Sequence, residues 1–206
     1  MGLARASRQR LADYPWVYLR GGLPPSTGET LVELAAAGDT SLARGVNFRQ
    51  ALGSSAPWLR AADLALVNLE SAITADPAAG GAPPPEPYRL AAPPEAAAAL
   101  ARAGIDLAGL ANNHAADGGS LAETAGYLTG AGISPVGLSG QQPVLRQIKG
   151  IRLAFLAFNA AGGPGTAGDE TAAQWDKEAC LAAVRRARMA ADGVIVSMHW
   201  GYEYDR

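Results

Sequence analysis

The chain has 206 residues, 49% of them hydrophobic, which is enough to bury a core and is typical of a globular protein. Its 17 Lys and Arg and 19 Asp and Glu residues give a net charge of −2 without long blocks of either sign, so nucleic acid is not an expected partner. The single cysteine, Cys180, excludes a disulfide within the chain, and no apolar run approaches the ~20 residues of a membrane span or resembles a signal peptide.

The order of predicted elements favours an α/β fold. Residues 1–30 lack a clear period and are expected to be an N-terminal extension, followed by one domain over residues 31–206. Six apolar runs are predicted to be buried strands: 31–37, 64–69, 105–110, 133–138, 151–158 and 194–198. Helix start and stop signals predict three helices: 94–103, 120–131 and 177–191. Two segments rich in Pro, Gly and Ala are predicted to be exposed connectors: 76–87 and 160–168. Alternation of strands and helices predicts a largely parallel sheet.

Four of the predicted strands run directly into polar clusters. These are Gly38-Asp39, Asn68-Leu69-Glu70, Asn112-Asn113-His114 with Asp117, and His199-Trp200-Gly201 with Glu203. In parallel α/β sheets, ligands bind outside the carboxyl ends of strands, so we expect the four clusters to converge in space.

The residue types in these clusters suit a divalent metal ion. Both histidines of the chain fall in them, and carboxylate, amide and imidazole donors together favour Mn²⁺, Fe²⁺ or Zn²⁺. Two such ions about 3.5–4 Å apart would clamp a phosphoryl group and activate water, with a histidine off the metal protonating the leaving oxygen. Each cluster alone also has a structural interpretation: Asp39, Asn112 and Asn113 could cap turns, and Glu70 could be solvated.

Other catalytic classes find less support in the sequence. There is no Gly-x-Ser-x-Gly elbow, and Ser197 is not placed to lose its proton to His199. The Gly-rich stretch 162–168 lacks the Gly-Lys-Ser/Thr ending of a phosphate loop.

The ordered motifs resemble those of the bacterial capsule-synthesis CapA (PGA_cap) family. The resemblance runs from about Leu31 to Arg206 and rests on four motifs in order: 38–44, 62–70, 110–119 and 197–204. The connecting segments 103–106 and 149–152 agree with it.

The resemblance implies a relative of calcineurin-like metallophosphoesterases, with a four-layer α/β/β/α sandwich and one or two divalent ions. It implies a part in making poly-γ-glutamate or another capsule polymer, with the synthesis machinery and an anionic polymer or phosphoester as partners; such proteins are often at the cell surface. The implied metal ligands are Asp39, Glu70, Asn113 and His199, and the implied proton donor is His114. Substrate contact or ligand support is implied for Arg44, Asn68, Asn112, Asp117 and Glu203.

Two departures from the family pattern modify this expectation. Asp39-Thr40-Ser41 stands where calcineurin-like enzymes have Asp-x-His, which removes one imidazole and predicts weaker binding of one ion. The sequence stops at Arg206, before a Gly-His-x-Pro-His-like motif of the family, so we expect the sheet and the site to be incomplete at the C-terminus. Two alternatives therefore stay open: a non-catalytic polymer-binding or scaffold component of a capsule synthesis complex, and a fragment that does not fold alone.

Overall fold

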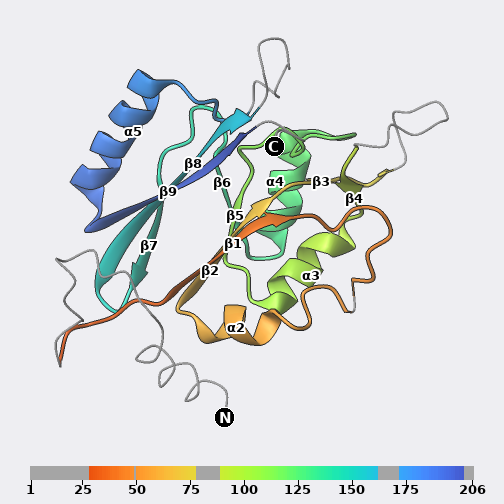
Figure 1. The fold of residues 1–206 in the computed structure, drawn as a ribbon, viewed down its shortest axis with the longest axis horizontal. Helices are drawn as coiled ribbons and strands as arrows, with labels where there is room; N and C mark the ends of the chain where they lie inside the picture. The colour runs from red at the N-terminus through yellow and green to blue at the C-terminus, as the bar shows by residue number, and fades with distance from the viewer. Residues whose placement is uncertain (1–27, 49, 78–88, 162–171, 202–206) are drawn as a thin grey trace.

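The computed structural model describes residues 28–48, 50–77, 89–161 and 172–201, which form nine strands and four helices (Figure 1). The strands are β1 (Leu34–Thr40), β2 (Leu64–Leu69), β3 (Ala72–Ile73), β4 (Ala91–Ala92), β5 (Leu107–Gly109), β6 (Ser134–Val136), β7 (Val144–Ile148), β8 (Ile151–Ala161) and β9 (Gly193–Gly201). The helices are α2 (Ala56–Ala61), α3 (Glu95–Ala103), α4 (Leu121–Gly130) and α5 (Lys177–Ala190). Within these residues, no helix is both long and apolar enough to cross a bilayer.

The first sheet has four parallel strands in the order β1-β2-β5-β6. Helices α2, α3 and α4 lie in the connections between these strands and pack on one face of the sheet (Figure 1). Val67 and Leu69 of β2 are buried in this core together with Leu100 of α3 and Leu128 of α4. Because the strands are parallel, their carboxyl ends meet at one edge of the sheet.

The second sheet has three strands in the order β7-β8-β9. β7 and β8 form an antiparallel hairpin, whose two turn residues Lys149 and Gly150 have φ of 52° and 85°. Two positive φ values are typical of the hairpin turn whose twist matches that of the paired strands. β8 and β9 are parallel and are joined through α5, which packs on this sheet through Cys180 against Leu156 and Phe158 (Figure 1).

A separate apolar cluster joins the two sheets. Leu66 and Leu107 of the first sheet are buried with Phe155 and Ala157 of the second. Gly137, with φ of 96°, lies between them: a β-carbon there would come within 2.9 Å of the Ala157 β-carbon. This close approach requires glycine and fixes how the carboxyl ends of the two sheets meet.

The register between β1 and β2 shifts by one residue immediately before the polar end of β1. Ala37 pairs with Val67, but Asp39 pairs with Asn68, so Gly38 is an extra residue in a β-bulge. Since side chains alternate between the two faces of a strand, the extra residue places the Asp39 side chain on the same face as Asn68.

The short parallel pair β3–β4 lies just beyond the end of β2. Ala72 pairs with Ala91 and Ile73 with Ala92, and the Ala72 amide donates to the Leu90 carbonyl at 2.9 Å. The buried Thr124 hydroxyl of α4 accepts from the Ile73 amide at 3.0 Å. This pair therefore holds the segment that follows Glu70 beside the segment that precedes α3.

The predicted α/β class with a parallel sheet is confirmed, while several element boundaries were wrong. β1 begins three residues later than predicted, and β1 and β9 continue through Asp39 and His199, which the sequence placed after the strands. Ala160 and Ala161 belong to β8 rather than to a connector. Four elements were not predicted: α2, β3, β4 and β7. Residues 1–27 and most of both predicted connectors lie outside the described residues, so the predicted domain boundary at residue 30 stays a prediction.

Candidate metal centre

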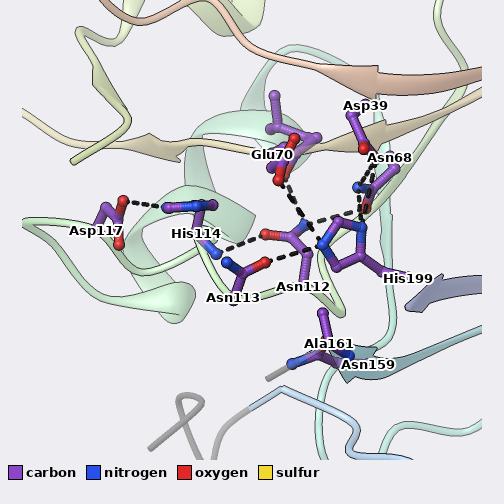
Figure 2. Close-up of polar contacts among 11 residues, drawn as sticks. Asp39, Asn68, Glu70, Asn112, Asn113, His114, Asp117, Asn159, Ala161 and His199 are labelled. Atoms are coloured by element: carbon purple, nitrogen blue, oxygen red, sulfur yellow. Dashed lines mark hydrogen bonds and ion pairs between the residues drawn. The ribbon is translucent and has the colours of Figure 1, made fainter. Parts of the chain in front are cut away.

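The polar clusters come together where the carboxyl ends of the two sheets meet (Figure 2). Asp39 comes from β1, Glu70 follows β2, and Asn113 lies in the turn after β5. His199 comes from the other sheet, near the end of β9. The convergence predicted from four separate strand ends is therefore present in the structure.

Asp39, Glu70 and His199 form the tightest group of possible ligands. One ligand atom from each lies within 4.8 Å of the others. Nδ1 of His199 lies 3.4 Å from Asp39 Oδ1, and Nε2 lies 3.7 Å from Glu70 Oε1. Asn113 adds a fourth donor, because its Oδ1 lies 2.9 Å from His199 Nε2. The two carboxylates thus face opposite nitrogens of one imidazole ring.

Two asparagine side chains, Asn112 and Asn68, connect this group to the backbone. The His114 amide donates to Asn112 Oδ1 at 3.0 Å, so Nδ2 is the donor end of Asn112. That Nδ2 donates to the Leu69 carbonyl at 2.9 Å and to Asn68 Oδ1 at 3.0 Å. Asn112 is 1% exposed and Asn68 is 8% exposed, which leaves these amides little access to solvent partners.

The same connections determine the proton position on His199. With its Oδ1 accepting from Asn112, Asn68 presents Nδ2 to Asp39 Oδ1 at 2.6 Å and to His199 Nδ1 at 3.1 Å. A neutral imidazole that accepts at Nδ1 carries its hydrogen on Nε2, which then donates to Asn113 Oδ1. We refer to Asn112, Asn68 and His199 as the amide relay.

His114 points away from the amide relay toward Asp117 (Figure 2). Its Nδ1 lies 2.7 Å from Asp117 Oδ2, and both side chains are largely buried. The same carboxylate oxygen accepts from the Leu90 amide at 2.8 Å. A histidine held by a carboxylate in this way has a fixed ring orientation, which a proton donor requires.

Two of the predicted residues are not placed at the site by these contacts. Arg44 is exposed in the turn after β1, with φ of 59°. Glu203 lies outside the described residues. Their predicted support of the site stays a prediction.

Asn159 is a buried polar residue beside the site that the sequence reasoning missed. It pairs with His199 in the register of β8 and β9 and is 2% exposed (Figure 2). Its Oδ1 accepts from the Ala161 amide at 3.0 Å, and its Nδ2 donates to Gln174 Oε1 at 3.3 Å. A polar residue after the apolar run Leu153–Phe158 was a usable signal, because it repeats the pattern of Asn68 after the apolar run of β2.

The fold and the site together define an α/β protein with a candidate cation site where two sheets meet. The family model for bacterial capsule synthesis protein PGA_cap matches residues 27–206. The chain belongs to this family, as its motifs predicted. A comparison with curated proteins finds no match.

Proposed function

We propose that this chain is a metal-dependent, phosphoesterase-like hydrolase domain that acts in capsule synthesis. Membership in the capsule synthesis family supports the biological setting. The packing of α2–α4, two sheets and α5 supports a four-layer α/β/β/α sandwich of the metallophosphoesterase type. The substrate class is a phosphoester or a related oxyanionic intermediate of an anionic polymer such as poly-γ-glutamate, and the partners are the other components of the synthesis machinery.

The observation that carries the proposal is the approach of Asp39, Glu70 and His199 to within 4.8 Å of one another. These residues come from three different strand ends, so local sequence does not bring them together. Carboxylate and imidazole donors suit Mn²⁺, Fe²⁺ or Zn²⁺, and thiolate ligands are absent from the group. When bound, such an ion supplies Lewis-acid activation of a phosphoryl oxygen and of water.

The donors divide into two sets around the His199 ring. Glu70 and Asn113 face Nε2, whereas Asp39 and Asn68 face Nδ1. Each ring nitrogen can bind one ion. His199 can therefore share an ion with Glu70 and Asn113 through Nε2, or with Asp39 through Nδ1. We therefore assign Asp39, Glu70, Asn113 and His199 as ligands of one or two ions, and Asn68 and Asn112 as residues that orient them.

His114 is the residue that we assign as proton donor. Asp117 accepts the Nδ1 hydrogen and stabilises the imidazolium, so Nε2 is the atom that delivers a proton to the leaving oxygen. The amide relay links the two histidines, because Asn112 contacts the His114 backbone at one end and Asn68 at the other. This connection supports our proposal of a proton donor beside the metal centre.

Metal binding is tested by calorimetric titration of the chelator-treated protein with Mn²⁺, Zn²⁺ and Fe²⁺. Wild type should bind at least one of these ions and gain thermal stability, because a ligand of the folded state stabilises it. Asp39→Asn and Glu70→Gln should each bind at least about tenfold more weakly. Glu178→Gln, an exposed carboxylate on α5, is the matched control and should bind as wild type does. Absence of binding of all three ions would overturn the proposal.

Hydrolysis is tested on bis(p-nitrophenyl) phosphate with the metal that binds. His114→Ala should lower kcat by about 100-fold or more, the usual contribution of a general acid. Equal rates for wild type and His114→Ala would remove the assigned role of this histidine. A protein that binds metal but does not hydrolyse any phosphoester would instead favour the polymer-binding or scaffold component.

A further inference from the structure

A pocket lies between α5 and the turn that follows β6. Its volume is about 270 Å³. Pockets that hold drug-sized ligands have volumes of about 300–1,000 Å³, so this one has room for a smaller molecule. It is separate from the candidate metal centre, because neither the proposed metal ligands nor His114 line it.

Small residues on both sides leave this space open. Ala179, Ala183 and Arg186 line the pocket from α5, and their spacing of four and three residues places them on one side of the helix. Gly137 and Gly140 line it from the turn after β6. Larger side chains at the two alanines and two glycines would fill the space, so the pocket follows from the choice of residues.

Hydrogen bonds hold the walls of the pocket in place. Gln141 Oε1 accepts from the Gly137 amide at 2.9 Å and from the Leu138 amide at 3.2 Å. Its Nε2 donates to the Pro135 carbonyl at 2.9 Å, which closes the turn. The segment before α5 is joined to this turn, because the Ala173 amide donates to the Gly137 carbonyl at 2.8 Å. A pocket with fixed walls binds a ligand without first paying the entropy of ordering them.

The lining combines a buried apolar part with an exposed polar rim. Leu156 and Phe158 of β8 are buried and belong to the apolar part. The rim includes three exposed polar side chains: Ser139, Gln142 and Arg186. Among the described residues that line the pocket, Arg186 carries the only formal charge. The pocket is therefore suited to a ligand with an apolar group and a negative charge.

The Arg186 guanidinium is available for such a ligand. Within the part of the chain that the structure describes, it has neither an ion pair nor a hydrogen bond. A guanidinium offers paired N–H donors that match the two oxygens of a carboxylate or a phosphate. Arg185 and Arg188 of the same helix are also exposed but do not line the pocket, so the position of Arg186 rather than its exposure distinguishes it.

We propose that this pocket binds a small organic anion, namely a carboxylate or a phosphate monoester with a short apolar group. The charged group contacts Arg186, and the apolar group lies against Ala179 and Ala183. Binding requires no metal and does not depend on the proposed hydrolase function, so the two proposals stand or fall separately.

The test is titration of the ¹⁵N-labelled, chelator-treated full chain with butyrate, propyl phosphate and 1-butanol, followed by amide chemical shifts. At least one of the two anions should bind with a dissociation constant on the order of 1 mM and shift the amides of Ser139 and Ala183. The neutral alcohol should bind at least about tenfold more weakly. Arg186→Gln should weaken anion binding at least about tenfold, whereas Arg185→Gln is the matched control and should leave it unchanged. Preference for butyrate or for propyl phosphate identifies the charged group that the pocket selects.

A second variant fills the pocket without changing any charge. Ala179→Leu lies at an exposed position of α5 and introduces a good helix former, so the variant should fold as wild type by circular dichroism. It should bind the anion at least about tenfold more weakly, while Ala190→Leu, at an exposed position of α5 that does not line the pocket, should bind as wild type does. The proposal would be overturned if neither anion bound, if 1-butanol bound as tightly as the anions, or if Arg186→Gln or Ala179→Leu kept wild-type affinity.

Discussion

His199 Nδ1 lies 3.1 Å from Asn68 Nδ2, so an amide group rather than a carboxylate is the nearest partner of this imidazole nitrogen. The orientation of the Asn68 amide follows from backbone groups at the far end of the relay, namely the His114 amide and the Leu69 carbonyl. The tautomer of His199 is therefore set by contacts two side chains away.

The first prediction concerns this tautomer. In the metal-free protein at a pH where His199 is neutral, we expect the hydrogen on Nε2. Asn68→Asp replaces the donor by an acceptor and should move the hydrogen to Nδ1. Imidazole ¹⁵N chemical shifts distinguish the two forms, and the chain has only two histidines to assign. A wild-type spectrum with the hydrogen on Nδ1 would contradict the relay.

Removal of the relay should also weaken the folded state. Asn68→Ala removes the Oδ1 that accepts from the buried Asn112 amide and the Nδ2 that donates to Asp39. The free energy of unfolding should therefore fall by about 1–3 kcal/mol. Metal affinity should fall about 10–100-fold. Urea unfolding and metal titration measure the two effects. Wild-type values in both would show that the relay contributes neither to stability nor to metal affinity.

The third prediction concerns the carboxylate that holds His114. Asp117→Asn keeps the size of the side chain but removes the charge that stabilises the imidazolium. We expect kcat for phosphodiester hydrolysis to fall while KM stays near the wild-type value, because the interaction strengthens only as the proton is transferred. A rise in KM with unchanged kcat would instead indicate a role in substrate binding.

A pair of glycine substitutions tests the contact between the sheets. Gly137→Ala forces a side chain into positive φ and against Ala157, and should cost about 1–3 kcal/mol of stability. Gly126→Ala, at an exposed position of α4 with no atom near the new β-carbon, should instead stabilise by about 0.5–1 kcal/mol. Urea unfolding of both variants is the measurement, and an equal effect of the two would contradict the close approach.

The last prediction concerns pH. The Arg152 amide donates to Asp192 Oδ2 at 2.8 Å and lowers the pKa of Asp192 below its ordinary value of 3.8. A carboxylate whose pKa is lowered in the folded state stabilises the fold at pH values above its ordinary pKa. This stabilisation is lost as the pH falls through the folded-state pKa. Asp192→Asn should therefore be less stable than wild type at neutral pH, with the difference shrinking in acid. A difference that grows in acid would contradict this.

The sequence predicted the class of fold and the convergence of the polar clusters because both depend on periodicity and strand polarity. The predicted ends of β1 and β9 were too early, because the apolar run ends before the backbone pairing ends. Asp39 still pairs with Asn68, and His199 still pairs with Asn159. The short β3–β4 pair depends on contacts between distant segments, which a local pattern does not contain.

The amide relay could not be predicted from the sequence for a different reason. Asparagine at a strand end has the same sequence signal whether it caps a turn or orients a neighbour, and only side-chain geometry separates the two.

The bulge at Gly38 makes the direction of the Asp39 side chain depend on the register of β1 against β2. If the two strands paired without the bulge, Gly38 would lie opposite Asn68 and Asp39 opposite Leu69, which would turn Asp39 toward the helices although every proposed ligand is still encoded. Deletion of Gly38 would leave Asp39 directly after Ala37 and still opposite Asn68, so homologues that keep the aspartate but lack this one residue should keep the site.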